Sequence, residues 1–152
     1  MNSVSSSTTT GIAVREAVAE DALQIAGLLG ALGYPSTETL VRDRLAHLSV
    51  RAEDAVFVAD YAGELAGFLS FHISPLFHAE GCLGRITALA VSTRFQRSGI
   101  GRQLVAAAEQ FAWTHGCVRI EVTSGDHRLD AHAFYEAVGF RMDIRRFIKS
   151  QP

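Results

Sequence analysis

The chain has 152 residues, which is long enough for one domain with a substantial hydrophobic core. Apolar residues make up 48% and charged residues 20%, as in ordinary globular domains, and the formal net charge of −2 gives no general attraction to nucleic acid. The composition therefore predicts a single globular unit and argues against a nucleic-acid-binding protein.

The N-terminal segment 1–10 and the two cysteines suggest no specific chemistry. Segment 1–10 is rich in Ser and Thr and has neither a basic start nor an apolar stretch, so we expect a disordered tail and not a secretion signal. Cys82 and Cys117 have no metal-ligand or CxxC spacing, and no apolar run reaches the length of a membrane span. We therefore expect one domain over residues 11–152 of a cytoplasmic protein, without a metal or a membrane partner.

Hydrophobic periodicity and turn residues predict strands and helices in mixed order along this domain. In chain order they are a strand over Ile12–Ala17, a helix from Asp21 to Gly33, a helix from Ser36 to Leu48, strands over Ala55–Asp60 and Leu65–Ile73, a strand over Arg85–Val91, a helix from Gly101 to His115, a strand over Cys117–Thr123, a helix from Leu129 to Val138 and a last strand or pair of strands over Phe140–Ile148. The tight turn at Gly63 predicts an antiparallel hairpin, and the strand–helix–strand unit over 86–123 predicts a right-handed parallel crossover. Because the strand Arg85–Val91 shows no polar alternation, we expect it to be buried on both faces of a mixed sheet.

The turn Phe95–Arg102, between an apolar strand and the next helix, combines two glycines with two arginines. The first amides of a helix have no partner within the helix, and Gly99 and Gly101 allow these amides to converge on one point. The two arginines add positive charge, and Arg94 is a further candidate. The pattern favours a ligand with several anionic oxygens, such as a pyrophosphate, although a glycine turn that only ends a strand has the same sequence.

Two other phosphate-binding patterns do not fit this turn. A P-loop requires GxxxxGK followed by Ser or Thr, and the chain contains no such run. The dinucleotide fingerprint GxGxxG lies near a first strand and needs a third glycine where this chain has Leu104. The turn therefore belongs to neither of these classes of nucleotide-binding protein.

The same turn resembles the acyl-CoA loop of the GCN5-related N-acetyltransferases, which reads Arg/Gln-x-x-Gly-x-Gly/Ala and is matched here by 96–101, "QRSGIG". "LAVSTRF" at 89–95 is similar to that family's fourth strand and the approach to the loop. "AHAFYEAVGF" at 131–140 is similar to its last helix and the strand that follows. The resemblance extends from Ile12 to about Ile148. It implies an α/β (α+β) fold with a mixed, splayed sheet of about six to seven strands, flanked by about four helices.

The resemblance implies a site for acetyl-CoA as co-substrate. The backbones of Leu89 and Val91 would pair with the pantetheine arm, as an added strand pairs with a sheet edge. The residues implied to hold the pyrophosphate are Gln96, Arg97, Ser98, Gly99, Ile100, Gly101 and Arg102. Arg128 stands where the family often has an Asn that contacts the cofactor, so this arginine would reach a phosphate or a pantetheine carbonyl, or else face solvent.

Tyr135 stands at the position of the family's catalytic tyrosine. The resemblance implies that its hydroxyl protonates the departing CoA thiolate, and the alternative is a packed aromatic ring whose hydroxyl has a backbone partner. Some family members carry their general base as a carboxylate on the fourth strand, where the strand Arg85–Val91 has none. The general base stays open among Glu121, His72, His78, Glu80 and water.

The resemblance implies N-acetyl transfer from acetyl-CoA to a primary amine by direct attack in a ternary complex, because neither cysteine lies where a covalent carrier would. The acceptor would be a small-molecule amine or a protein amino group, and the early helices (21–48) and the loop 74–84 are expected to shape its site. The residues expected at its entrance are Tyr34, Pro35, Phe77, His78, Ala79 and Glu80. The alternative is a non-catalytic module that senses acyl-CoA, and the resemblance is compatible with a homodimer.

Overall fold

The structure is a computed structural model that describes residues 11–124, 129–143 and 146–152. Its helices and strands are β1 (Ile12–Glu16), α1 (Ala22–Leu32), α2 (Glu38–Ser49), β2 (Asp54–Tyr61), β3 (Glu64–Pro75), β4 (Cys82–Val91), α3 (Ile100–Thr114), β5 (Cys117–Val122) and α4 (Leu129–Ala137). The tail expected over 1–10 and the contact expected of Arg128 lie outside the described residues. Within those residues, every helix is too short or too polar to span a membrane.

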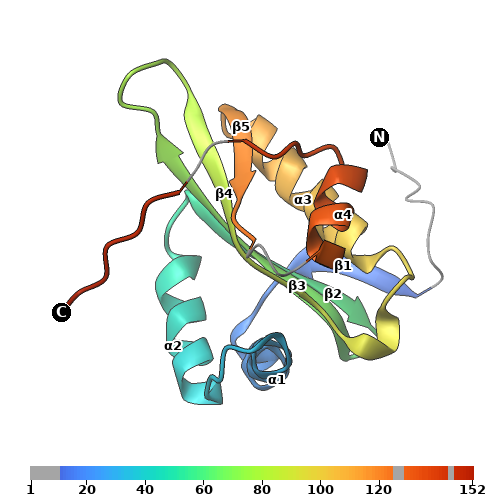
Figure 1. The fold of residues 1–152 in the computed structure, drawn as a ribbon. Coiled ribbons are helices and arrows are strands. Elements are labelled where there is room, and N and C mark those ends of the chain that lie inside the picture. The colour runs from blue at the N-terminus through green and yellow to red at the C-terminus, as the bar shows by residue number, and fades with distance from the viewer. Residues whose placement is uncertain (1–10, 125–128, 144–145) are drawn as a thin grey trace, which may run out of the picture.

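A single mixed sheet, in the order β1-β2-β3-β4-β5, lies between two layers of helices (Figure 1). The first four strands are antiparallel neighbours, and β5 lies parallel to β4 after the crossover through α3. One core cluster joins the sheet to α3 through residues such as Phe71 and Leu104. A second joins the opposite face to α1 and α2 through Phe68 and Leu45. The mixed sheet, the antiparallel hairpin and the parallel crossover are confirmed.

The sheet has five strands among the described residues, fewer than the six to seven expected. The difference lies in the predicted last strand, because the described parts of 140–148 have no regular structure. The Phe140 amide instead donates to the carbonyl oxygen of Tyr135 at 2.9 Å, and Phe147 and Ile148 are exposed. A strand needs a neighbour that pairs with its backbone, and among the described strands none pairs with this segment, so its apolar pattern alone misled the prediction.

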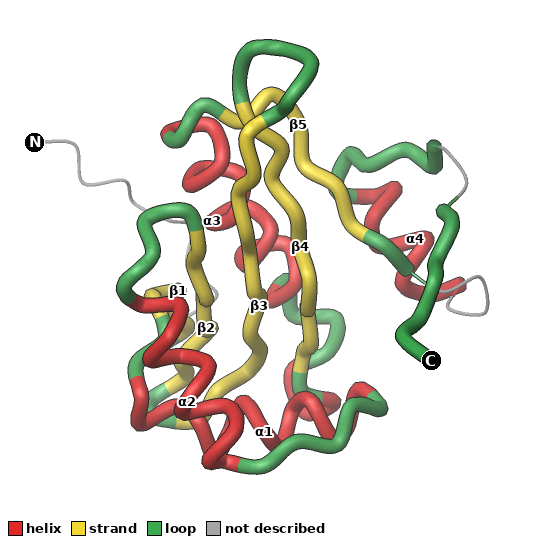
Figure 2. Tube along the Cα trace, turned by 90° about the vertical axis from the view of Figure 1, so that its left-hand side faces the viewer, coloured by secondary structure: helices red, strands yellow, loops and turns green. Residues whose placement is uncertain are grey.

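β4 pairs with β5 over only part of its length. The parallel register joins Cys82–Ile86 of β4 to β5, and beyond Ile86 the two strands diverge (Figure 2). Residues Ala88–Val91 therefore pair with β3 alone, and from Thr87 onward the other edge of β4 has no strand partner among the described residues. The splayed sheet is confirmed. The expectation that Arg85–Val91 is buried on both faces is wrong at Thr87, which is exposed because it borders an open space between the sheet and α2.

The start of each early helix differs in detail from the prediction. Thr37, and not Ser36, caps α2, because its hydroxyl oxygen accepts the Leu40 amide at 3.1 Å. Asp21 does stand at the N-cap position of α1, but its side chain forms no capping bond to that helix. Gly33 ends α1 in a left-handed conformation, as predicted.

The buried Asp21 carboxylate ties β1 to the start of α1. It accepts two hydrogen bonds from the Arg15 guanidinium, at 2.8 and 2.9 Å, and one from the Val18 amide at 2.8 Å. The bonds from Arg15 lower the pKa of Asp21 below its usual value, although burial opposes that shift. The ionised form of Asp21 therefore stabilises the fold.

We expect Asp21→Asn to lower the free energy of unfolding by about 1–2 kcal/mol at neutral pH, a modest loss because Arg15 is 36% exposed and partly screened by solvent. Because the folded state holds the pKa of Asp21 below 3.8, the contribution of its charge is complete above that pH. It is lost as the pH falls through the lower pKa of the folded state. Urea unfolding at neutral and acid pH gives the free energy of unfolding of both proteins, and we expect the difference between wild type and variant to shrink in acid. A difference that does not depend on pH would refute this role of Asp21.

Candidate active site

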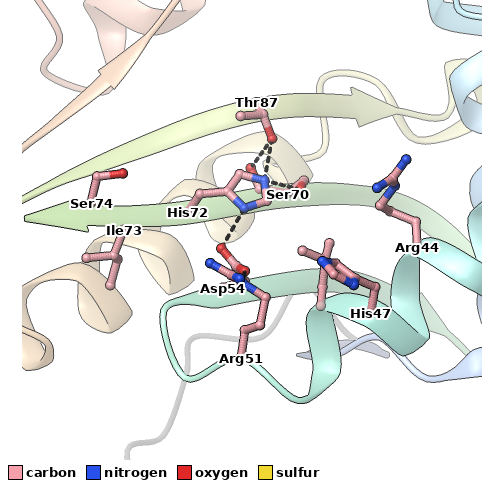
Figure 3. Close-up of a pocket in the computed structure, with 10 residues that line it drawn as sticks. Arg44, His47, Arg51, Asp54, Ser70, His72, Ile73, Ser74 and Thr87 are labelled. Atoms are coloured by element: carbon pink, nitrogen blue, oxygen red, sulfur yellow. Dashed lines mark hydrogen bonds and ion pairs between the residues drawn. The ribbon is translucent and has the colours of Figure 1, made fainter.

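An open pocket of about 510 Å³ lies where β3 and β4 face α2 (Figure 3). Its walls come from α2 and the turn after it, from the start of β2, from β3 and from the middle of β4. The lining residues are Arg44, His47, Leu48, Arg51, Asp54, Ser70, His72, Ile73, Ser74 and Thr87. Thr87 is also the first residue of the open edge of β4, so the pocket and this edge adjoin.

His72 has a polar partner on each nitrogen of its imidazole ring. Nδ1 is 2.8 Å from Oδ1 of Asp54, while Nε2 is 2.8 Å from the Thr87 hydroxyl and 3.0 Å from the Ser70 hydroxyl (Figure 3). Because an ionised carboxylate can only accept hydrogen bonds, Asp54 holds a proton on Nδ1. In the neutral ring, Nε2 then presents its lone pair to the two hydroxyl groups, which is the arrangement of a general base.

The Asp54 carboxylate is nearly enclosed, with 6% of its side chain exposed, and it also accepts the Nε–H of Arg51 at 2.5 Å. Burial alone would raise the pKa of Asp54, but the hydrogen bonds from His72 and Arg51 outweigh burial and lower it. Asp54 is therefore ionised at neutral pH. A proton gained by His72 would be stabilised by a negative charge 2.8 Å away.

The hairpin of β2 and β3 brings Asp54 and His72 together. The two residues are directly opposite each other in the antiparallel register, where side chains on the same face are close neighbours. On the other side of β3, the register with β4 shifts so that Ser70 pairs with Ala88 while Phe71 pairs with Ile86. The extra residue of this bulge is Thr87, and bulges re-aim side chains in this way.

The glycine turn forms the N-terminus of α3. Gly99 is the N-cap residue, with a φ of +81°, and Arg97 has a φ of +65°. The first backbone hydrogen bond of α3 joins the Gln103 amide to the Gly99 carbonyl oxygen at 3.1 Å. Within the described residues, the amides of 97–102 form no hydrogen bond to the backbone. A Cβ atom on Gly99 would meet nothing within 4 Å, so open space adjoins the turn at this residue. Free amides at the positive end of a helix dipole suit an anionic group.

Tyr135 lies on α4, close to the start of α3. Its half-buried ring packs against Phe134 and Phe140, with centroids 5.3 and 5.6 Å apart. The neighbouring Phe134 ring lies so close to Gly101 that a Cβ atom there would be 3.0 Å from it. Gly101 therefore allows α4 to approach α3. Tyr135 is not among the residues that line the pocket around His72.

Comparison with known sequences decides the family. The chain matches the Acetyltransferase (GNAT) family over residues 21–140. It belongs to the GNAT acetyltransferases.

Individual GNAT relatives differ in how much of the chain they match. Aminoalkylphosphonate N-acetyltransferase of Salmonella typhimurium (strain LT2) is 34% identical over 88 residues, which are 58% of this chain and 57% of the relative, so the match spans little more than half of that protein. Aminoglycoside N(6')-acetyltransferase type 1 of Stenotrophomonas maltophilia is 32% identical over 133 residues, 84% of each chain. The crystal structure of aminoglycoside N-acetyltransferase AAC(6')-Iy in complex with CoA has a TM-score of 0.81 at 17% identity, covering 92% of this chain and 94% of that one, and shares its fold.

Of the four side chains considered as the general base of this GNAT domain, only His72 lines the pocket. Glu121 lies on β5, where it accepts hydrogen bonds from Arg85 at 3.4 Å and Arg119 at 3.1 Å. His78 and Glu80 are exposed in the loop between β3 and β4. None of the residues expected at the acceptor entrance lines the pocket; these are Tyr34, Pro35, Phe77, His78, Ala79 and Glu80. Residues of α2, one of the early helices expected to shape the acceptor site, do line it, as does Ser74 from the expected range 74–84.

The residues expected to bind the co-substrate fall on two neighbouring parts of the GNAT domain. Leu89 and Val91 lie on the open edge of β4, with side chains packed toward α3. The other expected residues form the turn and the first residues of α3; they are Gln96, Arg97, Ser98, Gly99, Ile100, Gly101 and Arg102. Arg94 pairs with Glu64 of β3, and its guanidinium group lies over the Phe95 ring, 5.3 Å from the ring centroid.

Proposed function

We propose that this GNAT protein transfers an acetyl group from acetyl-CoA to a primary amine of a small molecule, with His72 as the proton acceptor. The observation that carries the proposal is the His72–Asp54 pair in a pocket that adjoins the open edge of β4. An amine in its ammonium form cannot attack a carbonyl group, so an N-acetyltransferase needs a group that takes the proton. A module that only senses acyl-CoA has no such need.

The described residues fit acetyl-CoA, which supplies the acyl group activated as a thioester. The backbone edge at Leu89 and Val91 has no partner among the described strands and would pair with the amide-bearing pantetheine arm. The amides of 97–102 and the side chains of Arg97 and Arg102 would hold the pyrophosphate, as the resemblance implies. Within the described residues Arg97 has no ion pair, and Arg102 has one long bond of 3.4 Å to a carbonyl oxygen, so both guanidinium groups retain unused donors.

The side chains around the pocket would move the protons of the reaction. His72 would take the amine proton at Nε2, directly or through the hydroxyl of Thr87 or Ser70, and Asp54 would stabilise the resulting imidazolium. The amine nitrogen forms the new C–N bond as the C–S bond breaks, in a ternary complex without an acyl-enzyme. Tyr135 is the proposed donor of the proton that the departing thiolate takes.

Release of free CoA thiol from acetyl-CoA, measured with a panel of small amines, tests this function. We expect thiol release that depends on the amine and saturates with its concentration. Acetyl-CoA that binds but stays intact with every amine of the panel would support the sensor instead.

Changing Gly99 to Val should weaken CoA binding by about tenfold or more, or roughly 1.4 kcal/mol. A β-branched residue is strained at a φ of +81°, and the turn would relieve the strain by moving the amides at the start of α3. Calorimetric titration with CoA gives the affinity. Gly116→Val is the matched control, because Gly116 follows the other end of α3 with a φ of +80° and the same open surroundings. Equal CoA affinities of the two folded variants would rule out the role of the turn.

A further inference from the structure

The α2 side of the pocket carries positive charge that the proposed proton transfer does not use. Arg44 and His47 lie at positions i and i+3 of α2, a spacing that places side chains on one face of a helix, and Arg51 follows in the turn after α2. That helix face and the turn line the pocket opposite β3, and Figure 3 shows the three side chains along the same wall. All three are exposed.

Most of the hydrogen-bond donors on this wall have no partner. The side chains of Arg44 and His47 form no hydrogen bond or ion pair with any other described residue. Arg51 uses only its Nε–H on Asp54, which leaves the donors of both terminal nitrogens unused. Asp54 is the one acidic residue among those that line the pocket, and it is already shared between Arg51 and His72. The wall therefore has more positive than negative charge, even with both histidines neutral.

We propose that this wall binds the anionic group of the acceptor, and that the acceptor is a small primary amine that carries a phosphonate or phosphate. This inference rests on the proposed function, because it assigns the acceptor of the same pocket. A tetrahedral dianion offers several oxygens to donors that arrive from Arg44, His47 and Arg51, and charged hydrogen bonds of this kind are the strong ones. With the anion on the α2 wall, a short linker directs the amine toward His72 on β3.

The same charges disfavour a polycationic acceptor. Its extra ammonium groups would meet Arg44 and Arg51, and the carboxylate that could balance them is already engaged. Like charges brought together in a pocket cost free energy that no described group offsets. The charge of the acceptor thus distinguishes this proposal from acetyl transfer to amines in general.

Four primary amines with different second groups test the proposal. They are 2-aminoethylphosphonate, β-alanine, ethanolamine and 1,3-diaminopropane. We expect kcat/KM to be highest for the phosphonate, at least about tenfold above ethanolamine, and lowest for the diamine. If β-alanine is the best acceptor, the pocket prefers a carboxylate to a phosphonate, and the assignment is overturned. A preference for ethanolamine or for the diamine would overturn it as well. Turnover with those amines would still support the proposed function.

Arg44→Gln tests the wall itself, because Arg44 does not contact His72 or Asp54. The ratio of kcat/KM for 2-aminoethylphosphonate to that for ethanolamine should fall by about tenfold in this variant. Arg42→Gln is the matched control, since Arg42 lies on the same helix, pairs with Glu38 at 3.0 Å and does not line the pocket. Equal changes of the ratio in the two variants would overturn the proposal.

A binding measurement separates this inference from the proposed function. Ethylphosphonate has no amine and cannot be acylated, so its calorimetric titration reports the wall whether or not the protein turns over. We expect binding to the wild type and to Arg42→Gln, and about tenfold weaker binding to Arg44→Gln. No binding, or binding that Arg44→Gln leaves unchanged, would refute the anion site even if amines are acetylated. Binding without turnover of any amine would uphold the anion site and refute the proposed function.

Discussion

Replacing His72 by Gln should lower kcat by about 10²-fold or more and leave the affinity for acetyl-CoA nearly unchanged. Gln can still bond to Thr87 and Ser70, but it cannot take a proton at neutral pH. The measurement is kcat by thiol release together with calorimetric binding of acetyl-CoA. His78→Gln is the matched control, because His78 is exposed in the loop between β3 and β4 and does not line the pocket.

The pH profile of kcat distinguishes a proton acceptor from a residue that only shapes the pocket. The wild type should lose activity toward acid as the base becomes protonated, and His72→Gln should lose this limb of the profile. Asp54→Asn should also lower kcat, because an amide no longer fixes the proton on Nδ1 or stabilises the imidazolium. If His72→Gln keeps both its rate and the acid limb, another group takes the proton.

Changing Tyr135 to Phe should lower kcat by up to about 10²-fold with little change in CoA affinity. The hydroxyl would act on the thiolate only as it leaves, so its loss affects the transition state more than the bound ground state. The ring contacts with Phe134 and Phe140 can persist in the variant. Tyr34→Phe is a suitable control, because Tyr34 is exposed in the connection between α1 and α2.

A thermal melt, measured together with the rate, tests the alternative that Tyr135 is only a packed aromatic residue. If the hydroxyl only stabilises the packing of α4, the variant melts earlier and keeps its rate per folded molecule. That outcome would end the assignment of Tyr135 as the acid.

The conformation of the glycine turn could be predicted from the sequence because its features are local. A glycine at the N-cap, a second glycine in the first helical turn and two arginines lie within a few residues, and backbone conformation follows directly from such spacing. The role of Gly101 could not be predicted from its neighbours in the sequence. Its missing side chain makes room for Phe134, which lies in α4 far along the chain. The pairing of Arg94 with Glu64 of β3 likewise depends on the tertiary fold.

The Asp54 partner of His72 escaped prediction because of one extra residue in the hairpin. Tyr61 pairs with Glu64 beside the turn, and an unbroken register counted outward from there would place Phe71 opposite Asp54. A shift between Ala59 and Asp60 moves the register by one residue, and His72 then faces Asp54. Since neighbouring side chains point to opposite faces of a strand, a shift of one residue decides whether the pair exists. Propensities do not reveal where a bulge falls.

Part of the basic wall could have been found in the sequence, because Arg44 and His47 lie three residues apart in the predicted helix from Ser36 to Leu48. Charges at such spacing usually mark a solvated helix face, and only the position of α2 against β3 makes the wall part of a pocket. The open edge of β4 was expected from the family resemblance alone. Nothing in the apolar run Arg85–Val91 indicates where β5 stops pairing with it.

The balance between thiol and product tests acetyl transfer most directly. Acetyl-CoA that carries a labelled acetyl group is incubated with an accepted amine, and free thiol and labelled N-acetyl amine are quantified in the same samples. We expect equal amounts of the two products in the wild type and a parallel loss of both in His72→Gln. Thiol release without labelled amine, or acetyl-CoA that stays bound and intact, would contradict it.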